Sequence, residues 1–168
     1  MKPIQICTHL GKDTIDAFFD ELSAREIRSV FRASGVRTNV GSAAYSRTGR
    51  LAVWRKRLHG ELDKGNEKVA LAFLLEWLVG HHNEMLVDYL DHLEVPHRNG
   101  QTDEDFCETR TPDQLREAAE VLLAKYPAQH VAVYLLLVGH LQECDVFDGM
   151  EALTSALSTG GGGAEAAS

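Results

Sequence analysis

The sequence predicts an all-α fold in which a single compact domain of about five to seven helices surrounds one long central helix. Three observations predict this class. Apolar residues recur at helical spacing along most of the chain, capping signals precede several of these segments, and strand-like alternation is confined to a short stretch near the amino terminus. We expect an amino-terminal arm over residues 1–12, the helical domain over residues 13–157 and a flexible Gly/Ala tail over residues 158–168.

The composition of the chain argues against a membrane-spanning, a secreted or a disulfide-rich protein. The chain has 168 residues and a net charge of −8. It contains no apolar run of about 18 residues that could cross a membrane. Its first residues lack the apolar segment of a signal peptide, so we expect a cytoplasmic protein. Three widely separated cysteines form no CxxC pair, which favours reduced thiols over a disulfide framework or a zinc knuckle.

The first elements are an arm and two helices. The segment PIQIC alternates apolar and polar residues over too short a length to decide a strand, and we interpret it as an extended arm. Asp13 can then cap an amphipathic helix. Its apolar stripe consists of Ile15, Phe18, Phe19 and Leu22. A second helix begins at Ser23, because Ser23 and Glu26 form a capping box, and Gly35 is a natural residue to follow its end.

The middle of the chain predicts a loop and a third helix before the central one. Residues 36–49 show no sustained periodicity and are expected to form a loop longer than most connections. A third helix is predicted over residues 50–63, although Gly60 weakens it. The central helix, over residues 67–93 with Asn66 as its cap, is apolar on more than one side, which is typical of a buried helix.

The last third of the chain predicts further helices. Thr111, Pro112 and Gln114 supply the cap, the first position and the capping-box partner of one of them. The apolar run over residues 131–138 fits a helix or a buried strand, and we favour a helix because its neighbours are helical. A short final helix near residue 151 precedes the tail.

A stripe of histidines and acids on the central helix is the candidate for metal or acid/base chemistry. Helical spacing lets Asp88 and His92 converge on one cation, with His81 and His97 as further ligands. An enzyme built on this stripe would use His81 or Glu84 as its acid/base group. A solvated, salt-bridged helix face explains the same spacings, and neither HExxH nor paired ExxH motifs occur.

Charge is distributed unevenly along the chain. Residues 25–57 contain nine basic side chains and one acid, a net charge of +8, whereas residues 58–168 carry a net charge of −14. Such a basic segment can bind a polyanion or a protein partner, or can attract the acidic remainder of the chain. The candidate binding residues in it are Arg25, Arg28, Arg32, Arg55, Lys56 and Arg57.

The basic segment also resembles a known DNA-binding module. The stretches LSAREIRSVFRASGV and TGRLAVWRKRL resemble the two helices of SAP-type modules, over roughly 37 of the 168 residues. The resemblance implies a helix that ends at Gly35 and a second basic helix that contacts DNA. The chain departs from the family in a much longer connecting loop and in the register of the second helix.

Taken together, these patterns favour a non-catalytic module that binds a protein partner, because the helices are well signalled while no complete catalytic or cofactor motif is present. We therefore expect no cofactor. Two alternatives stay open. The first is a nucleic-acid-binding protein that uses residues 25–57, and the second is a metal-dependent enzyme that uses the stripe over residues 81–92.

Overall fold

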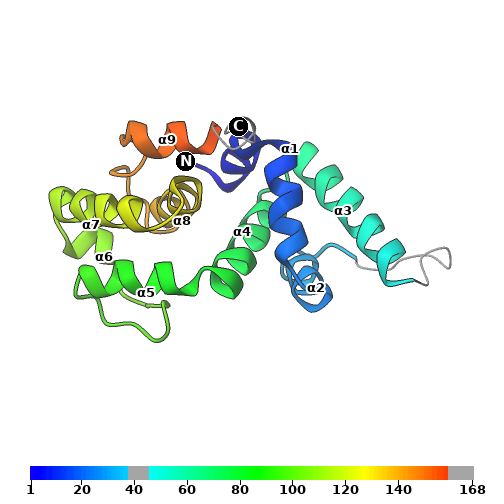
Figure 1. Cartoon of the computed structure of the whole chain (residues 1–168), viewed down its shortest axis with the longest axis horizontal. Helices are drawn as coiled ribbons and strands as arrows, with labels where there is room; N and C mark the ends of the chain where they lie inside the picture. Colours follow the sequence, from blue (N-terminus) through cyan, green and yellow to red (C-terminus); the bar gives the residue numbers. More distant parts are fainter. Residues whose placement is uncertain (38–45, 159–168) are drawn as a thin grey trace, which may run out of the picture. The chain divides into compact units, whose positions relative to one another are not determined.

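The all-α class is confirmed by a computed structural model, which describes residues 1–37 and 46–158 (Figure 1). Within these ranges the chain forms nine helices and no strand, apart from one isolated bridge between Arg98 and Gln101. The predicted number of about five to seven helices is too low. The difference has two sources: the central helix is interrupted, and a four-residue helix lies in the loop that follows it.

The described residues group into two compact units, and each is considered by itself. The amino-terminal unit comprises residues 3–81, and the carboxy-terminal unit comprises residues 1–2 and 82–168. The boundaries of a single domain over residues 13–157 stay a prediction. The tail prediction falls largely outside the described residues, although Ser158 is the last residue of a helix.

The amino-terminal unit begins with a helix where the sequence predicted an arm. Helix α1 spans Pro3–Glu21, and the short alternation in PIQIC misled the prediction because Ile6, Cys7 and Leu10 lie at helical spacing and are buried. Pro3 suits the first turn of this helix, where its missing N–H has no partner to lose. At Gly11 the helix kinks, with φ 73° and ψ 168°, a conformation that favours glycine.

Three further helices complete the amino-terminal unit: α2 (Ala24–Ala33), α3 (Arg47–Asp63) and α4 (Glu67–His81). Helix α4 packs against α1, α2 and α3 and is the core of the unit. The Trp77 ring stacks on Phe18 with centroids 3.7 Å apart, and its indole N–H donates to Glu21 at 2.9 Å. Phe73 and Trp77 lie on one side of α4 and are buried, whereas Leu71 and Leu75 on the other side are only half-buried.

The carboxy-terminal unit contains five helices. They are α5 (Asn83–His92), α6 (Phe106–Thr109), α7 (Pro112–Lys125), α8 (Ala128–Leu141) and α9 (Glu151–Ser158). The apolar run over residues 131–138 is helical, as favoured, and lies inside α8. Helix α8 packs against α7 and α9, and Tyr89 of α5 meets Tyr134 of α8 edge to face at 5.5 Å. The unit is thus built around α8, whose residues 131–137 are all buried.

The prediction of one continuous central helix over residues 67–93 is wrong. The helix stops at His81, and α5 begins at Asn83 after His82 adopts φ −125° and ψ 28°. Gly80 and two histidines are weak helix formers, so little local propensity opposes a break here. The apolar periodicity continues across the break, which is why periodicity alone did not reveal it.

Both predicted capping boxes are confirmed. The Ser23 hydroxyl accepts from the Glu26 N–H at the start of α2, and the Glu26 carboxylate accepts from the Ser23 N–H at 2.6 Å. Thr111 and Gln114 make the same reciprocal pair at the start of α7. No helix in the described part of the chain is long and apolar enough to span a bilayer.

Candidate functional site

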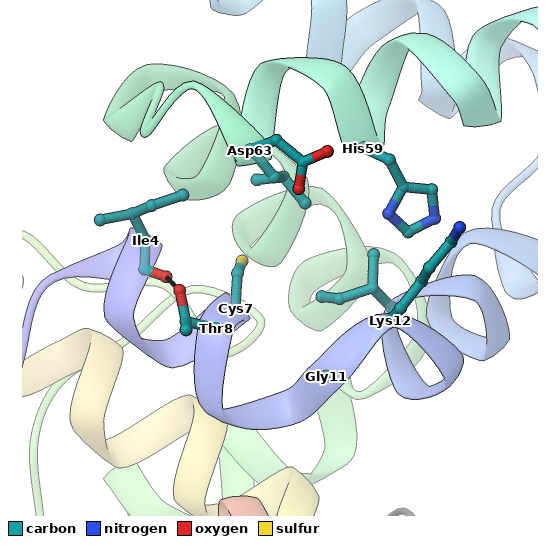
Figure 2. A pocket seen from close by; sticks show the side chains of 9 residues that line it. Ile4, Cys7, Thr8, Gly11, Lys12, His59 and Asp63 are labelled. Atoms are coloured by element: carbon teal, nitrogen blue, oxygen red, sulfur yellow. Dashed lines mark hydrogen bonds between the residues drawn. The ribbon is translucent and has the colours of Figure 1, made fainter.

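A groove lies between α1 and α3 in the amino-terminal unit. It consists of two adjoining cavities of about 400 and 700 Å³ between α1 and α3, which share Lys12, His59 and Asp63 as lining residues. We call this surface the α1–α3 groove. Figure 2 shows the smaller cavity, with the side chains of Lys12, His59 and Asp63 around it and the Cys7 thiol on the α1 side.

Helix α3 leaves much of its surface accessible because few of its side chains enter the core. Of its 17 residues, Trp54 and Leu58 are buried. Both lie on one side of the helix, four residues apart, and fix α3 to the unit. The Ser46 hydroxyl caps the helix by accepting from the Gly49 N–H at 2.9 Å. The predicted third helix therefore starts three residues earlier than expected, at Arg47.

Ion pairs and a hydrogen bond hold α3 against α1 on the groove side. The His59 Nε2 atom lies 2.8 Å from the Asp16 Oδ1 atom, and the Arg55 guanidinium lies 3.6 Å from the same carboxylate. Arg55 also pairs with Asp20 and lies over the Phe19 ring at 5.1 Å. The network fixes the two walls relative to each other, so that the groove is a preformed feature of this unit.

The chemistry available in the groove is limited by its thiol. Burial, followed by the nearby Glu67 carboxylate, raises the pKa of Cys7 to about 12. The thiol is therefore protonated at neutral pH and is a poor nucleophile. His59 is hydrogen-bonded to Asp16, and the described lining adds no activated nucleophile beside this pair.

The six predicted binding cations have different positions. Arg55 forms ion pairs with Asp16 and Asp20, so its positive charge is largely neutralised within the chain. Arg57 donates to the Arg37 carbonyl and is half-buried. Arg25, Arg32 and Lys56 are exposed, as is Arg28.

The structure brings the two predicted basic helices together. The Arg28 guanidinium of α2 lies over the Trp54 ring of α3, 5.7 Å from its centroid. Two further exposed cations, Arg47 and Arg50, begin α3, and they were counted in the basic segment but not selected as binding residues. The sequence feature that could have identified them is the absence of any acid between Arg47 and Arg57, so that all the charged side chains among the first eleven residues of α3 are basic.

The four residues predicted as possible metal ligands lie in ordinary ion pairs or at the surface. His81 Nε2 lies 3.4 Å from Glu26 Oε1 in the amino-terminal unit, and His92 is exposed in the other unit. His97 Nε2 lies 3.0 Å from Asp91 Oδ1, whereas Asp88 accepts hydrogen bonds from two side chains of the residues that end α7. Within residues 1–37 and 46–158, no three His, Cys, Asp or Glu side chains form a group that could hold a metal ion.

Comparison with known proteins adds no relative. No protein-family model, curated protein or solved structure matches this chain. The function must therefore be inferred from the surface itself. The sequence did not single out the α1–α3 groove, because its central pair joins residues 43 positions apart, Asp16 and His59.

Proposed function

We propose that this chain is a non-catalytic protein-interaction module that binds an acidic, amphipathic helix of a partner protein along α3. The observation that carries the proposal is the accessible surface of α3, which places a preformed groove beside an acid-free run of cations. In this proposal the module works in the cytoplasm and needs no cofactor.

The groove supplies the apolar part of the proposed interface. Leu51 and Ala52 line its larger cavity, which has a volume of about 700 Å³. Leu51 is half-buried and Ala52 is exposed, so both can be covered further by a partner. Burying one aliphatic side chain of a partner in such a place contributes about 1.5–3 kcal/mol. Amphipathic helices recognise grooves of this kind through side chains spaced one turn apart.

The cations supply the polar part and the preference for acidic partners. Lys56 lines the groove, and the exposed Arg47 and Arg50 flank Thr48, another lining residue, on α3. Carboxylates of a partner helix can pair with these cations at the rim, where they add specificity and speed of association more than affinity. Phosphates would satisfy the cations equally well, but they would leave the apolar lining uncovered.

A binding assay with matched peptides tests the proposal. One synthetic helix carries glutamates on one face and leucines on the other, and a scrambled peptide has the same composition without an apolar face. We expect the amphipathic peptide to bind roughly tenfold more tightly, because it alone buries leucine in the groove. Equal affinities would show that charge alone drives binding, which would contradict the proposal.

Charge reversal on α3 identifies the surface. The variant Arg50→Glu with Lys56→Glu should lose binding of the amphipathic peptide. The control Lys64→Glu with Lys68→Glu makes the same change in net charge at exposed positions outside the groove and should retain it. Tighter binding of duplex DNA than of the amphipathic peptide at the same salt concentration would overturn the proposal and favour the nucleic-acid alternative.

A further inference from the structure

Helix α7 of the carboxy-terminal unit presents an acidic face to solvent. Its buried side chains share one side of the helix and fix it to the unit: Leu115, Ala118, Ala119 and Leu122. The opposite side consists of exposed residues at helical spacing: Glu117, Glu120, Val121 and Ala124. We call these four residues the α7 acidic face. It combines two carboxylates with two apolar side chains, and Val121 is 44% exposed.

The two carboxylates of this face are not neutralised by neighbouring cations. Among the described residues, neither Glu117 nor Glu120 forms an ion pair, whereas Asp113 of the same helix pairs with Arg116 at 3.1 Å. The surrounding unit also has an excess of acids, with five basic and sixteen acidic side chains and a net charge of −11. Such a surface attracts a partner surface that carries free cations.

The α1–α3 groove has the complementary features. Lys12 of α1 and Lys56 of α3 both line its larger cavity, and both are exposed. Of the carboxylates in the lining, Asp16 is paired with Arg55 and His59, and the other belongs to the last residue of α3. A helix in the groove would therefore meet free cations from both α1 and α3.

From this complementarity we infer that the acidic helix bound in the α1–α3 groove is α7 of a second copy of this chain. In this contact the two carboxylates of the α7 acidic face pair with Lys12 and Lys56. The Val121 and Ala124 side chains cover the apolar lining supplied by Leu51 and Ala52. The inference rests on the proposed function, because it names the partner of the same groove.

The contact is small, so the self-association should be weak and sensitive to salt. Val121 and Ala124 bury less apolar surface than the leucines of the designed peptide, and the copies should therefore bind each other less tightly than they bind the peptide. Salt screens the ion pairs at the rim and should weaken the contact further. Each copy has one groove and one α7 acidic face, so the contact is either reciprocated within a pair or continued to a third copy.

Sedimentation equilibrium of the full chain tests the inference. At low salt we expect the average mass to rise with protein concentration above the 18.6 kDa of one chain, and added salt should reverse this rise. A mass of one chain at every concentration would overturn the inference. If the amphipathic peptide still bound the groove in that case, the proposed function would stand, so the two failures are distinguishable.

Charge reversal identifies the two surfaces. The groove variant Lys12→Glu with Lys56→Glu and the α7 variant Glu117→Lys with Glu120→Lys should each self-associate at least about tenfold more weakly than the parent chain. An equimolar mixture of the two variants should form a pair, because one retains its α7 acidic face and the other retains its groove. A chain with all four reversals should associate again, since its two surfaces are once more opposite in charge.

A matched control separates the α7 acidic face from the net charge. Asp103→Lys with Glu108→Lys makes the same charge change as the α7 variant at exposed positions outside α7, and it should self-associate at least as well as the parent chain. The α7 variant should still bind the amphipathic peptide, because its groove is unchanged. Equal losses in the control and the α7 variant, or a mixture of the groove and α7 variants that forms no pair, would overturn the inference.

Discussion

Helices α3 and α8 are similar in length but opposite in how they use their side chains. Helix α8 has 14 residues, of which eight are buried, while α3 has 17 residues, of which two are buried. The sequence of α8 is apolar on all sides, so its helix is stabilised by the packing around it. Helix α3 is held by the buried Trp54 and Leu58 and by polar contacts of Arg55 and His59 with α1, and several of its other side chains are exposed.

The difference separates a helix that is stabilised mainly by its burial, α8, from one that leaves many of its side chains exposed, α3. It is accompanied by a difference in charge between the units. Residues 3–81 contain twelve basic and nine acidic side chains, whereas residues 1–2 and 82–168 contain five basic and sixteen acidic ones. The amino-terminal unit therefore carries a net charge of +3 and the other unit carries −11. Substitutions on the two helices should consequently affect different properties.

The largest expected effect is a loss of stability from a substitution in α8, the buried helix of the two. Leu135→Asp places an unpaired charge at a position of α8 with no exposed surface and should destabilise the protein by more than about 4 kcal/mol. Chemical denaturation followed by circular dichroism measures this loss. The control Val121→Asp, at an exposed position of α7, should change the stability little. A parent-like melting transition for Leu135→Asp would show that α8 is not the core.

A second substitution tests the attachment of α3. The Trp54 side chain is 3% exposed and is one of the two buried anchors of the helix. Replacing it with alanine removes a large apolar contact and the partner of Arg28, so we expect a loss of about 3 kcal/mol in stability. Urea denaturation gives the value. A loss below about 1 kcal/mol would mean that α3 is scarcely packed onto its unit.

The elements that the sequence predicted well are those fixed by neighbouring residues. The capping boxes at Ser23 and Thr111 depend on groups three residues away, and both starts were found correctly. The sequence did not predict the break at His82, because the apolar spacing continues across it. It did not predict the helix in the arm, because the five residues PIQIC fit both the strand and the helix periodicity.

The candidate site was predicted only in part, for a different physical reason. Local charge identified the basic segment, including the exposed Lys56. Whether a cation forms an ion pair within the chain depends on tertiary contacts that the sequence does not show. Arg55, for example, pairs with Asp16 and Asp20 of α1.

A pH experiment measures a contact of intermediate size in the carboxy-terminal unit. Asp88 of α5 accepts hydrogen bonds from Lys125 and Tyr126, and the hydrogen bond from Lys125 is the main cause of its lowered pKa. A carboxylate with a lowered folded-state pKa stabilises the protein above its unfolded pKa of about 4 and loses this contribution as the pH falls through the folded value.

The variant Asp88→Asn should reproduce that loss at neutral pH. We expect a cost of about 1 kcal/mol or less, because the carboxylate is one-third exposed and solvent screens the pair. The variant should also lose less stability than the parent chain when the pH is lowered from 5 to about 3. Identical pH profiles for the two proteins, measured by urea denaturation, would show that Asp88 contributes nothing to the acid sensitivity.

The smallest expected effect on folding, and the sharpest test of the binding side of the comparison, is the pair Ala52→Glu and Val53→Glu. Both residues are exposed on α3, so each change should alter stability by no more than about 0.5 kcal/mol. Ala52 lines the α1–α3 groove, where a glutamate fills the apolar lining and repels an acidic helix; Val53 is outside that lining. We expect Ala52→Glu to weaken binding of the amphipathic peptide about tenfold, the equivalent of about 1.4 kcal/mol. Val53→Glu makes the same charge change outside the groove, where solvent and salt screen the new charge from the peptide, and should weaken binding by less than about threefold. Equal losses for the two variants would mean that the peptide senses only the charge of α3 and not its groove.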